Sequence, residues 1–97
     1  MANILIVDDS PTEVHVFRTM LEKNGHSVVV AQTGEEGIEK AKQVKPDLIL
    51  MDVQMPVMDG YAATRAIRSW ERDNDLPPTP IIALTALALK EEGARIF

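Results

Sequence analysis

Four short apolar segments constrain the fold of this chain more than any other feature of its sequence. Each is too short for a stable helix, rich in β-branched side chains, and apolar at successive rather than alternating positions. Strands that are apolar on both faces are typical of parallel sheets, in which helices cover both sides. We therefore predict four parallel strands, at Asn3–Val7, Ser27–Ala31, Asp47–Asp52 and Ile81–Thr85.

The segments between these strands carry helix start signals. Ser10-Pro11-Thr12-Glu13 forms a capping box with proline at the first helical position, and Thr33-Gly34-Glu35-Glu36 repeats the same signature. Asp59 is a candidate cap for a third helix, which runs toward the polar, proline-rich stretch 73–80. Residues 88–97 have a helical composition, so we expect a last helical segment there. Strands alternating with capped helices predict an α/β fold, a doubly wound parallel sheet.

Length and composition limit the number of domains and the classes of partner that the chain could bind. With 97 residues, of which 45% are hydrophobic and 26% charged, the chain should form one domain spanning residues 1–97. Its net charge of −5 argues against direct binding of nucleic acid, which depends on Lys and Arg. Cysteine is absent, and no apolar run approaches the roughly 20 residues that span a bilayer. We expect no membrane contact and a cytoplasmic location.

Polar residues follow the apolar strands at their carboxyl ends. Asp8 and Asp9 end the first strand, Asp52 ends the third, and Thr85 ends the fourth. Ligands of open parallel sheets collect at this edge, so the three carboxylates and the hydroxyl should lie close together. Such carboxylates repel one another unless a cation neutralises them, and oxygen-only ligands suit Mg²⁺. Asp8 and Asp9 taken alone would be explained equally well as turn acids near a helix N-terminus.

Several separated motifs, in order, resemble the receiver domains of two-component response regulators. They are "ILIVDDSP", "PDLILMDVQMPVMDGYAATRAIR" and "PIIALTA", and together they span nearly the whole chain. The first half is similar to single-domain chemotaxis and motility receivers, and the middle to receivers of hybrid histidine kinases. The resemblance implies a flavodoxin-like sheet with strand order 2-1-3-4.

The resemblance also implies roles for individual residues. Asp52 would be the phosphoacceptor of a phosphorelay, and Thr85 the switch hydroxyl that binds the new phosphoryl group. Asp8, Asp9, Asp52 and the backbone carbonyl of Gln54 would hold Mg²⁺. The partner would be a histidine kinase or a phosphotransfer protein. Such a domain signals by conformational change and is not an enzyme beyond self-phosphorylation and autodephosphorylation.

The resemblance breaks off at the C-terminus. Receiver domains carry a fifth strand ending in lysine and a fifth helix, whereas this sequence ends at "EEGARIF", and Lys90 lies too early to be that lysine. We therefore expect a C-terminally incomplete receiver, natural or engineered, whose exposed fourth-strand edge promotes homo-oligomers or exchange of an element between chains.

Two alternatives follow from different observations. Without its lysine, the chain could be a phosphorylation-incompetent interaction or assembly module that keeps the receiver fold. A phosphatase of the haloacid dehalogenase type also uses a strand-end aspartate, but it needs a second aspartate two residues later, where this chain has Gln54. His15 and His26 are isolated from the acidic residues, and we expect both at the surface.

Overall fold

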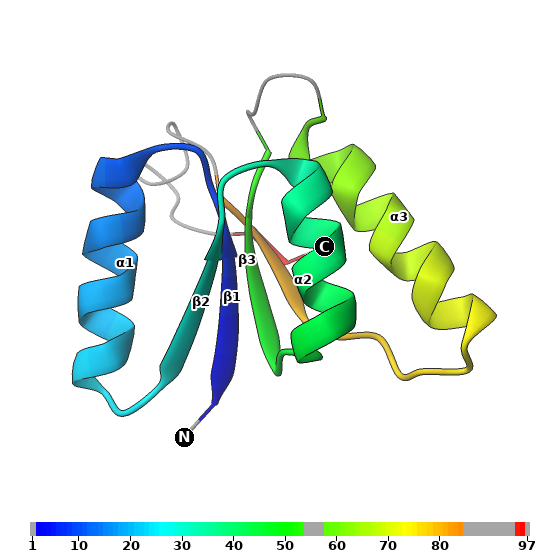
Figure 1. Ribbon diagram of the computed structural model, residues 1–97, viewed down its shortest axis with the longest axis horizontal. Coiled ribbons are helices and arrows are strands. Elements are labelled where there is room, and N and C mark those ends of the chain that lie inside the picture. Colours follow the sequence, from blue (N-terminus) through cyan, green and yellow to red (C-terminus); the bar gives the residue numbers. More distant parts are fainter. Residues whose placement is uncertain (1, 54–57, 85–94, 97) are drawn as a thin grey trace.

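The computed structural model describes residues 2–53, 58–84 and 95–96. A central sheet is covered by α1 on one face and by α2 and α3 on the other (Figure 1). Its strand order is β2-β1-β3-β4-β5, and the pairings β1–β2, β1–β3 and β3–β4 are parallel. The elements are β1 Asn3–Val7, α1 Pro11–Lys23, β2 Ser27–Ala31, α2 Gly34–Val44, β3 Leu48–Asp52, α3 Gly60–Asp73, β4 Ile81–Leu84 and β5 Arg95–Ile96.

The residues predicted to start the helices do so by capping them, and a glycine ends the turn after the first helix. The side chains of Ser10, Thr33 and Asp59 cap the three helices by accepting hydrogen bonds from backbone N–H groups of the first turn. After α1 the chain reverses at Gly25, whose φ of 87° is left-handed. The predicted ends of the first two strands match those observed, and the third starts one residue later than predicted, at Leu48.

Alternation along the strands divides the core between the two faces. Leu5 and Val7 of β1 pack with Ile49 and Met51 of β3 under α2 and α3. The intervening residues, which include Ile6 and Leu50, form a second cluster under α1. Side chains two residues apart on a strand point to the same face. Asp8 is therefore directed to the same face as Ile4 and Ile6, and Asp52 to the same face as Leu48 and Leu50.

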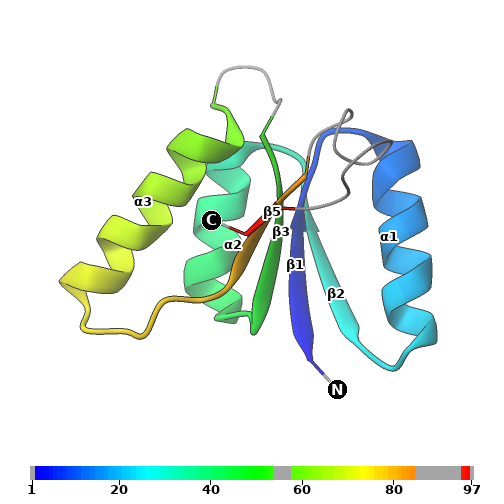
Figure 2. The same ribbon diagram turned by 180° about the vertical axis from the view of Figure 1, so that it is seen from behind.

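The C-terminal residues correct two expectations. Arg95 and Ile96 form β5, which pairs antiparallel with β4 through Ile82↔Ile96 and Ala83↔Arg95 (Figure 2). The predicted helical segment is therefore wrong at residues 95–96, because backbone pairing with an apolar strand edge overrides local propensity. The β4 edge is not unpaired at these two positions. The rest of the predicted segment, residues 88–94, lies outside the described part.

None of the helices in the described part of the chain is long and apolar enough to cross a membrane.

Candidate functional site

The register of the sheet places Asp8 beside Asp52. Val7 pairs with Met51, so the residues that follow, Asp8 and Asp52, end neighbouring strands at the same level. Asp8 continues the sheet pairing by donating its backbone N–H to the carbonyl of Ala31, at 3.0 Å. Alternation directs both carboxylates toward the face that α1 covers. The two predicted acids are thus brought together by register and by strand period.

Asp8 is a fully buried carboxylate with one oxygen satisfied and one not. Its side chain is 0% exposed. Oδ1 accepts a hydrogen bond from the backbone N–H of Ser10 at 2.8 Å, whereas Oδ2 is buried without a donor among the described residues. A buried oxygen without a partner carries a desolvation cost of about 1–3 kcal/mol, more when it is charged. A positively charged ligand would satisfy such an oxygen.

Glu13 is a third carboxylate that completes the cluster. One carboxylate oxygen from each of Asp8, Glu13 and Asp52 lies within 4.8 Å of the others. Glu13 lies in the first turn of α1, the helix that covers the sheet face toward which the Asp8 and Asp52 carboxylates are directed. The sequence pattern indicated Glu13 only as a capping residue, and its place in the site was missed. The only sequence signal was its position one turn into the helix that follows Asp8-Asp9.

The cluster perturbs the acidity of Asp8. Burial, and then the neighbouring Glu13 carboxylate, raise the pKa of Asp8 from 3.8 to about 6, against a smaller lowering by the Ser10 N–H. A divalent cation between these carboxylates would reverse the effect by stabilising the ionised form. At neutral pH without a cation, Asp8 is therefore charged at an energetic cost.

The donor set fits a hard cation. Every potential ligand in the cluster is a carboxylate oxygen, and one member of the cluster, Asp8, has an oxygen that is buried without a donor among the described residues. Oxygen-only sets with a few carboxylates suit Mg²⁺, which keeps several of its waters. The residues present thus fit the predicted ion.

The other predicted site residues are either outside the carboxylate cluster or outside the described part of the chain. Asp9, which we expected close to Asp8 and Asp52, is exposed and is not part of the three-carboxylate cluster, because it is one step out of phase with Asp8 along the chain. Gln54 and Thr85 lie outside the described residues. His15 is exposed, as predicted, whereas His26 is partly buried and its Nδ1 accepts the backbone N–H of Ala2 at 3.0 Å.

Gly60 holds α3 directly against the end of β3. A Cβ atom at this position would overlap the carbonyl oxygen of Asp52 and lie 2.8 Å from the Cα of Val53. Glycine therefore permits a backbone approach that any other residue would block. The first turn of α3, capped by Asp59 through the N–H of Ala62 at 2.8 Å, thus packs against the backbone of Asp52.

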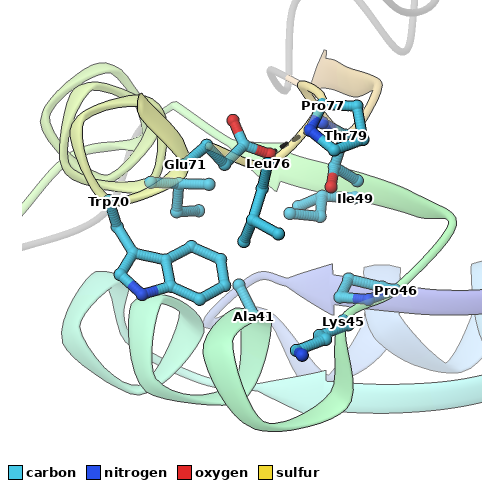
Figure 3. Close-up of a pocket in the computed structure, with 10 residues that line it drawn as sticks. Ala41, Lys45, Pro46, Ile49, Trp70, Glu71, Leu76, Pro77 and Thr79 are labelled. Atoms are coloured by element: carbon cyan, nitrogen blue, oxygen red, sulfur yellow. Dashed lines mark hydrogen bonds between the residues drawn. The ribbon is translucent and has the colours of Figure 1, made fainter. Parts of the chain in front are cut away.

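Among the described residues, cavities lie at both ends of the sheet. One, of about 440 Å³, opens beside Asp8 and Asp9 and extends to Glu36. The other, of about 230 Å³, lies between α2 and α3 at the far end and is lined mainly by apolar groups (Figure 3). There the buried Glu71 accepts hydrogen bonds from Thr79 N–H at 2.7 Å and from Arg68 Nη1 at 2.8 Å. Both carboxylate oxygens of Glu71 thus accept hydrogen bonds, unlike Oδ2 of Asp8, which has no donor among the described residues.

Comparison with known proteins places this site in a family. The family model described as "Response regulator receiver domain" matches residues 4–96. Protein PilH of Pseudomonas aeruginosa is 47% identical over 85 residues, which cover 88% of this chain and 68% of PilH. The sensor protein GacS of Pseudomonas syringae is 45% identical over 89 residues, which cover 92% of this chain but only 10% of GacS.

Solved structures agree with the sequence matches. The receiver domain of the sensor histidine kinase PA1611 from Pseudomonas aeruginosa superposes with a TM-score of 0.79 at 41% identity, covering 94% of this chain and 72% of that one. The flavodoxin-like fold and the strand order 2-1-3-4 expected from the sequence are thereby confirmed. The chain belongs to the response regulator receiver domains of two-component signalling.

Proposed function

We propose that this receiver domain accepts a phosphoryl group on Asp52 and that a bound Mg²⁺ assists the transfer. The observation that carries the proposal is the carboxylate cluster at the carboxyl edge of the sheet, where Asp8 Oδ2 is buried with no donor in the described part of the chain. Asp52 is 6% exposed and ends β3, so its carboxylate stands at the edge where ligands of parallel sheets bind.

The reaction assigned to Asp52 is a phosphoryl transfer. A carboxylate oxygen of Asp52 bonds to phosphorus while the bond from phosphorus to the imidazole nitrogen of a phosphohistidine donor breaks. The bonding electron pair stays on that nitrogen, and the product is an acyl phosphate. Asp52 is itself the nucleophile, and the packing of Gly60 against its backbone would hold the end of the strand in place.

The residues that would hold Mg²⁺ are Asp8, Asp9 and Asp52, together with the backbone carbonyl of Gln54, which lies outside the described residues. The bound ion would neutralise charge on the phosphoryl group as it approaches a pocket that is already negative. The similar PA1611 receiver domain carries a magnesium ion coordinated in its active-site cleft, which supports the same assignment.

The partners follow from the family. GacS is a sensor protein, and PA1611 is a sensor histidine kinase with a receiver domain, so we propose a histidine kinase or phosphotransfer protein as the donor. Phosphorylation adds about −1.5 to −2 charge, which would bias a conformational switch involving Thr85. The proposed setting is cytoplasmic, without direct contact to nucleic acid. Catalysis by the chain itself would be limited to its own phosphorylation and dephosphorylation.

A second candidate function is an interaction module that is not phosphorylated. It is favoured by the direction of β5, which pairs antiparallel with β4, so the described residues include no fifth parallel strand to place a lysine opposite Asp52. The two candidates differ in one observable, the formation of an acyl phosphate.

Intact-mass spectrometry after incubation with Mg²⁺ and acetyl phosphate separates them. The chain should gain the mass of one phosphoryl group, and Asp52→Asn should gain none. Asp59→Asn is the matched control, because asparagine caps a helix as well as aspartate does and Asp59 is not in the cluster. An unmodified wild-type chain would favour the interaction module.

A further inference from the structure

Two helices of this protein begin with the same sequence signature but use its glutamate differently. Ser10 and Thr33 are the N-caps, and each hydroxyl accepts the backbone N–H of a glutamate three residues later, Glu13 at 3.4 Å and Glu36 at 3.0 Å. In a capping box the glutamate side chain returns to accept a backbone N–H at the helix start. The two glutamates can therefore be compared directly.

Glu36 performs the structural role. Its Oε1 accepts the backbone N–H of Gln32 at 2.8 Å, and its Oε2 pairs with Lys40 Nζ at 3.1 Å. The hydrogen bond from Gln32, and then the bond from Lys40, lower the pKa of Glu36. This carboxylate is fully occupied by the start of α2.

Glu13 forms no equivalent bond in the described part of the chain, either with the N–H of Asp9, which is the counterpart of Gln32, or with that of its N-cap. The N–H of Ser10, which a capping-box glutamate would accept, donates instead to Asp8 Oδ1 at 2.8 Å. No backbone N–H of the described residues donates to the Glu13 carboxylate. The side chain instead contributes an oxygen within 4.8 Å of oxygens of Asp8 and Asp52.

We propose that Glu13 is a cation-site residue that tightens binding of the divalent ion, beyond the ligands that the receiver resemblance assigns. This inference rests on the proposed function, because it concerns the same site. Among the described residues, no cationic side chain and no backbone N–H pairs with this third carboxylate, and its charge beside Asp8 and Asp52 would be costly without a positive ligand. Its charge strengthens attraction for a divalent ion, whether the contact is direct or through a bound water.

The two possible roles of Glu13 predict opposite results when its charge is removed. A capping role predicts that Glu13→Ala lowers the stability of the metal-free protein, that Glu13→Gln, whose amide oxygen can still accept a backbone N–H, lowers it less, and that neither variant changes cation affinity. A cation-site role predicts weaker Mg²⁺ binding, while the metal-free protein is not destabilised because a like-charge repulsion has been relieved. Metal affinity and metal-free stability must therefore both be measured.

The test is calorimetric titration of the whole chain with Mg²⁺, alongside chemical unfolding in a chelator. Glu13→Gln should weaken Mg²⁺ binding about 10-fold or more, the range typical of residues that support a metal site. Glu13→Ala provides a second charge-removing variant. Glu36→Gln is the matched control, since it removes the equivalent carboxylate from a residue that lines the cavity beside Asp8 but is outside the cluster.

The outcomes separate this inference from the proposed function. If the wild type binds Mg²⁺ and both Glu13 variants bind it as tightly as Glu36→Gln, Glu13 has no role in the site and the inference is overturned. If the wild type itself binds no Mg²⁺, the metal-assisted function fails first. Weakened binding in both Glu13 variants, with metal-free stability retained, supports the inference.

Discussion

Asp8 shows at the scale of one residue how function competes with stability. The folded pKa of about 6 exceeds the ordinary value of 3.8, so the folded state holds the proton more tightly than the unfolded state does. As the pH rises from 3.8 to about 6, the free energy of unfolding of the metal-free protein therefore falls. Above about pH 6 the ionised Asp8 lowers this free energy by its full amount, about 3 kcal/mol. Binding of a cation is what would offset it.

Replacing Asp8 with Asn should therefore stabilise the metal-free protein. At neutral pH in a chelator, we expect the free energy of unfolding to rise by about 1–3 kcal/mol, because the neutral amide avoids burying a charge. Urea unfolding at a series of pH values measures this. The gain should shrink toward pH 4, where Asp8 in the wild type is protonated; a gain independent of pH would contradict the assigned cause.

Sequence pattern revealed part of the site at this scale and missed part. Asp8 and Asp52 were predictable, because strand-end acids in a parallel sheet converge whatever the side-chain details. Glu13 was not, because its departure from the capping box depends on which oxygen receives the Ser10 N–H. Asp9 is likewise adjacent in sequence to Asp8, yet the strand period leaves it exposed.

At the scale of the elements, the close approach of Gly60 to the backbone of Asp52 and Val53 holds α3 against the end of β3. Gly60→Ala should destabilise the fold by about 2 kcal/mol or more, since the added methyl group meets backbone rather than a movable side chain. Gly25→Asn is the control: its φ of 87° suits asparagine, and nothing lies within 4 Å of a Cβ there. Equal melting temperatures for the two variants would contradict the steric account.

The far end of α3 depends on the buried carboxylate of Glu71. Glu71→Ala should cost about 3 kcal/mol, because it leaves Arg68 and the Thr79 N–H without their acceptor. Glu22→Ala, which breaks an exposed pair with Arg18 at 3.4 Å, should cost less than about 1 kcal/mol. Thermal unfolding of both variants measures the two losses of stability. Equal losses would mean that the burial of Glu71 does not contribute to stability.

Helices and most strands were predictable from caps and apolar runs, but the role of Glu71 was not. The chain after α3 folds back and supplies the Thr79 N–H that the Glu71 carboxylate accepts. Long-range contacts of this kind leave no local signature. The same limitation explains β5, whose two residues are a strand only because β4 offers an edge.

For the whole molecule, the paired edge changes the expected association. Self-association was expected from an unpaired β4, and Ile82 and Ala83 are paired within the chain. We now expect the 97-residue chain to be less prone to associate than a variant ending at Ala94, which lacks β5. Light scattering across a concentration series should show larger species only for the shortened chain. Identical behaviour of the two would mean that β5 does not protect the edge.

The most direct test of the account is to locate the phosphoryl group. After incubation with Mg²⁺ and acetyl phosphate, borohydride reduces an acyl phosphate to an alcohol, which converts a phosphorylated aspartate into homoserine. Peptide mass spectrometry should find homoserine at position 52 alone, and only when Mg²⁺ is present. Modification at Asp8, at Glu13 or at no residue would contradict the assignment of Asp52 as the acceptor.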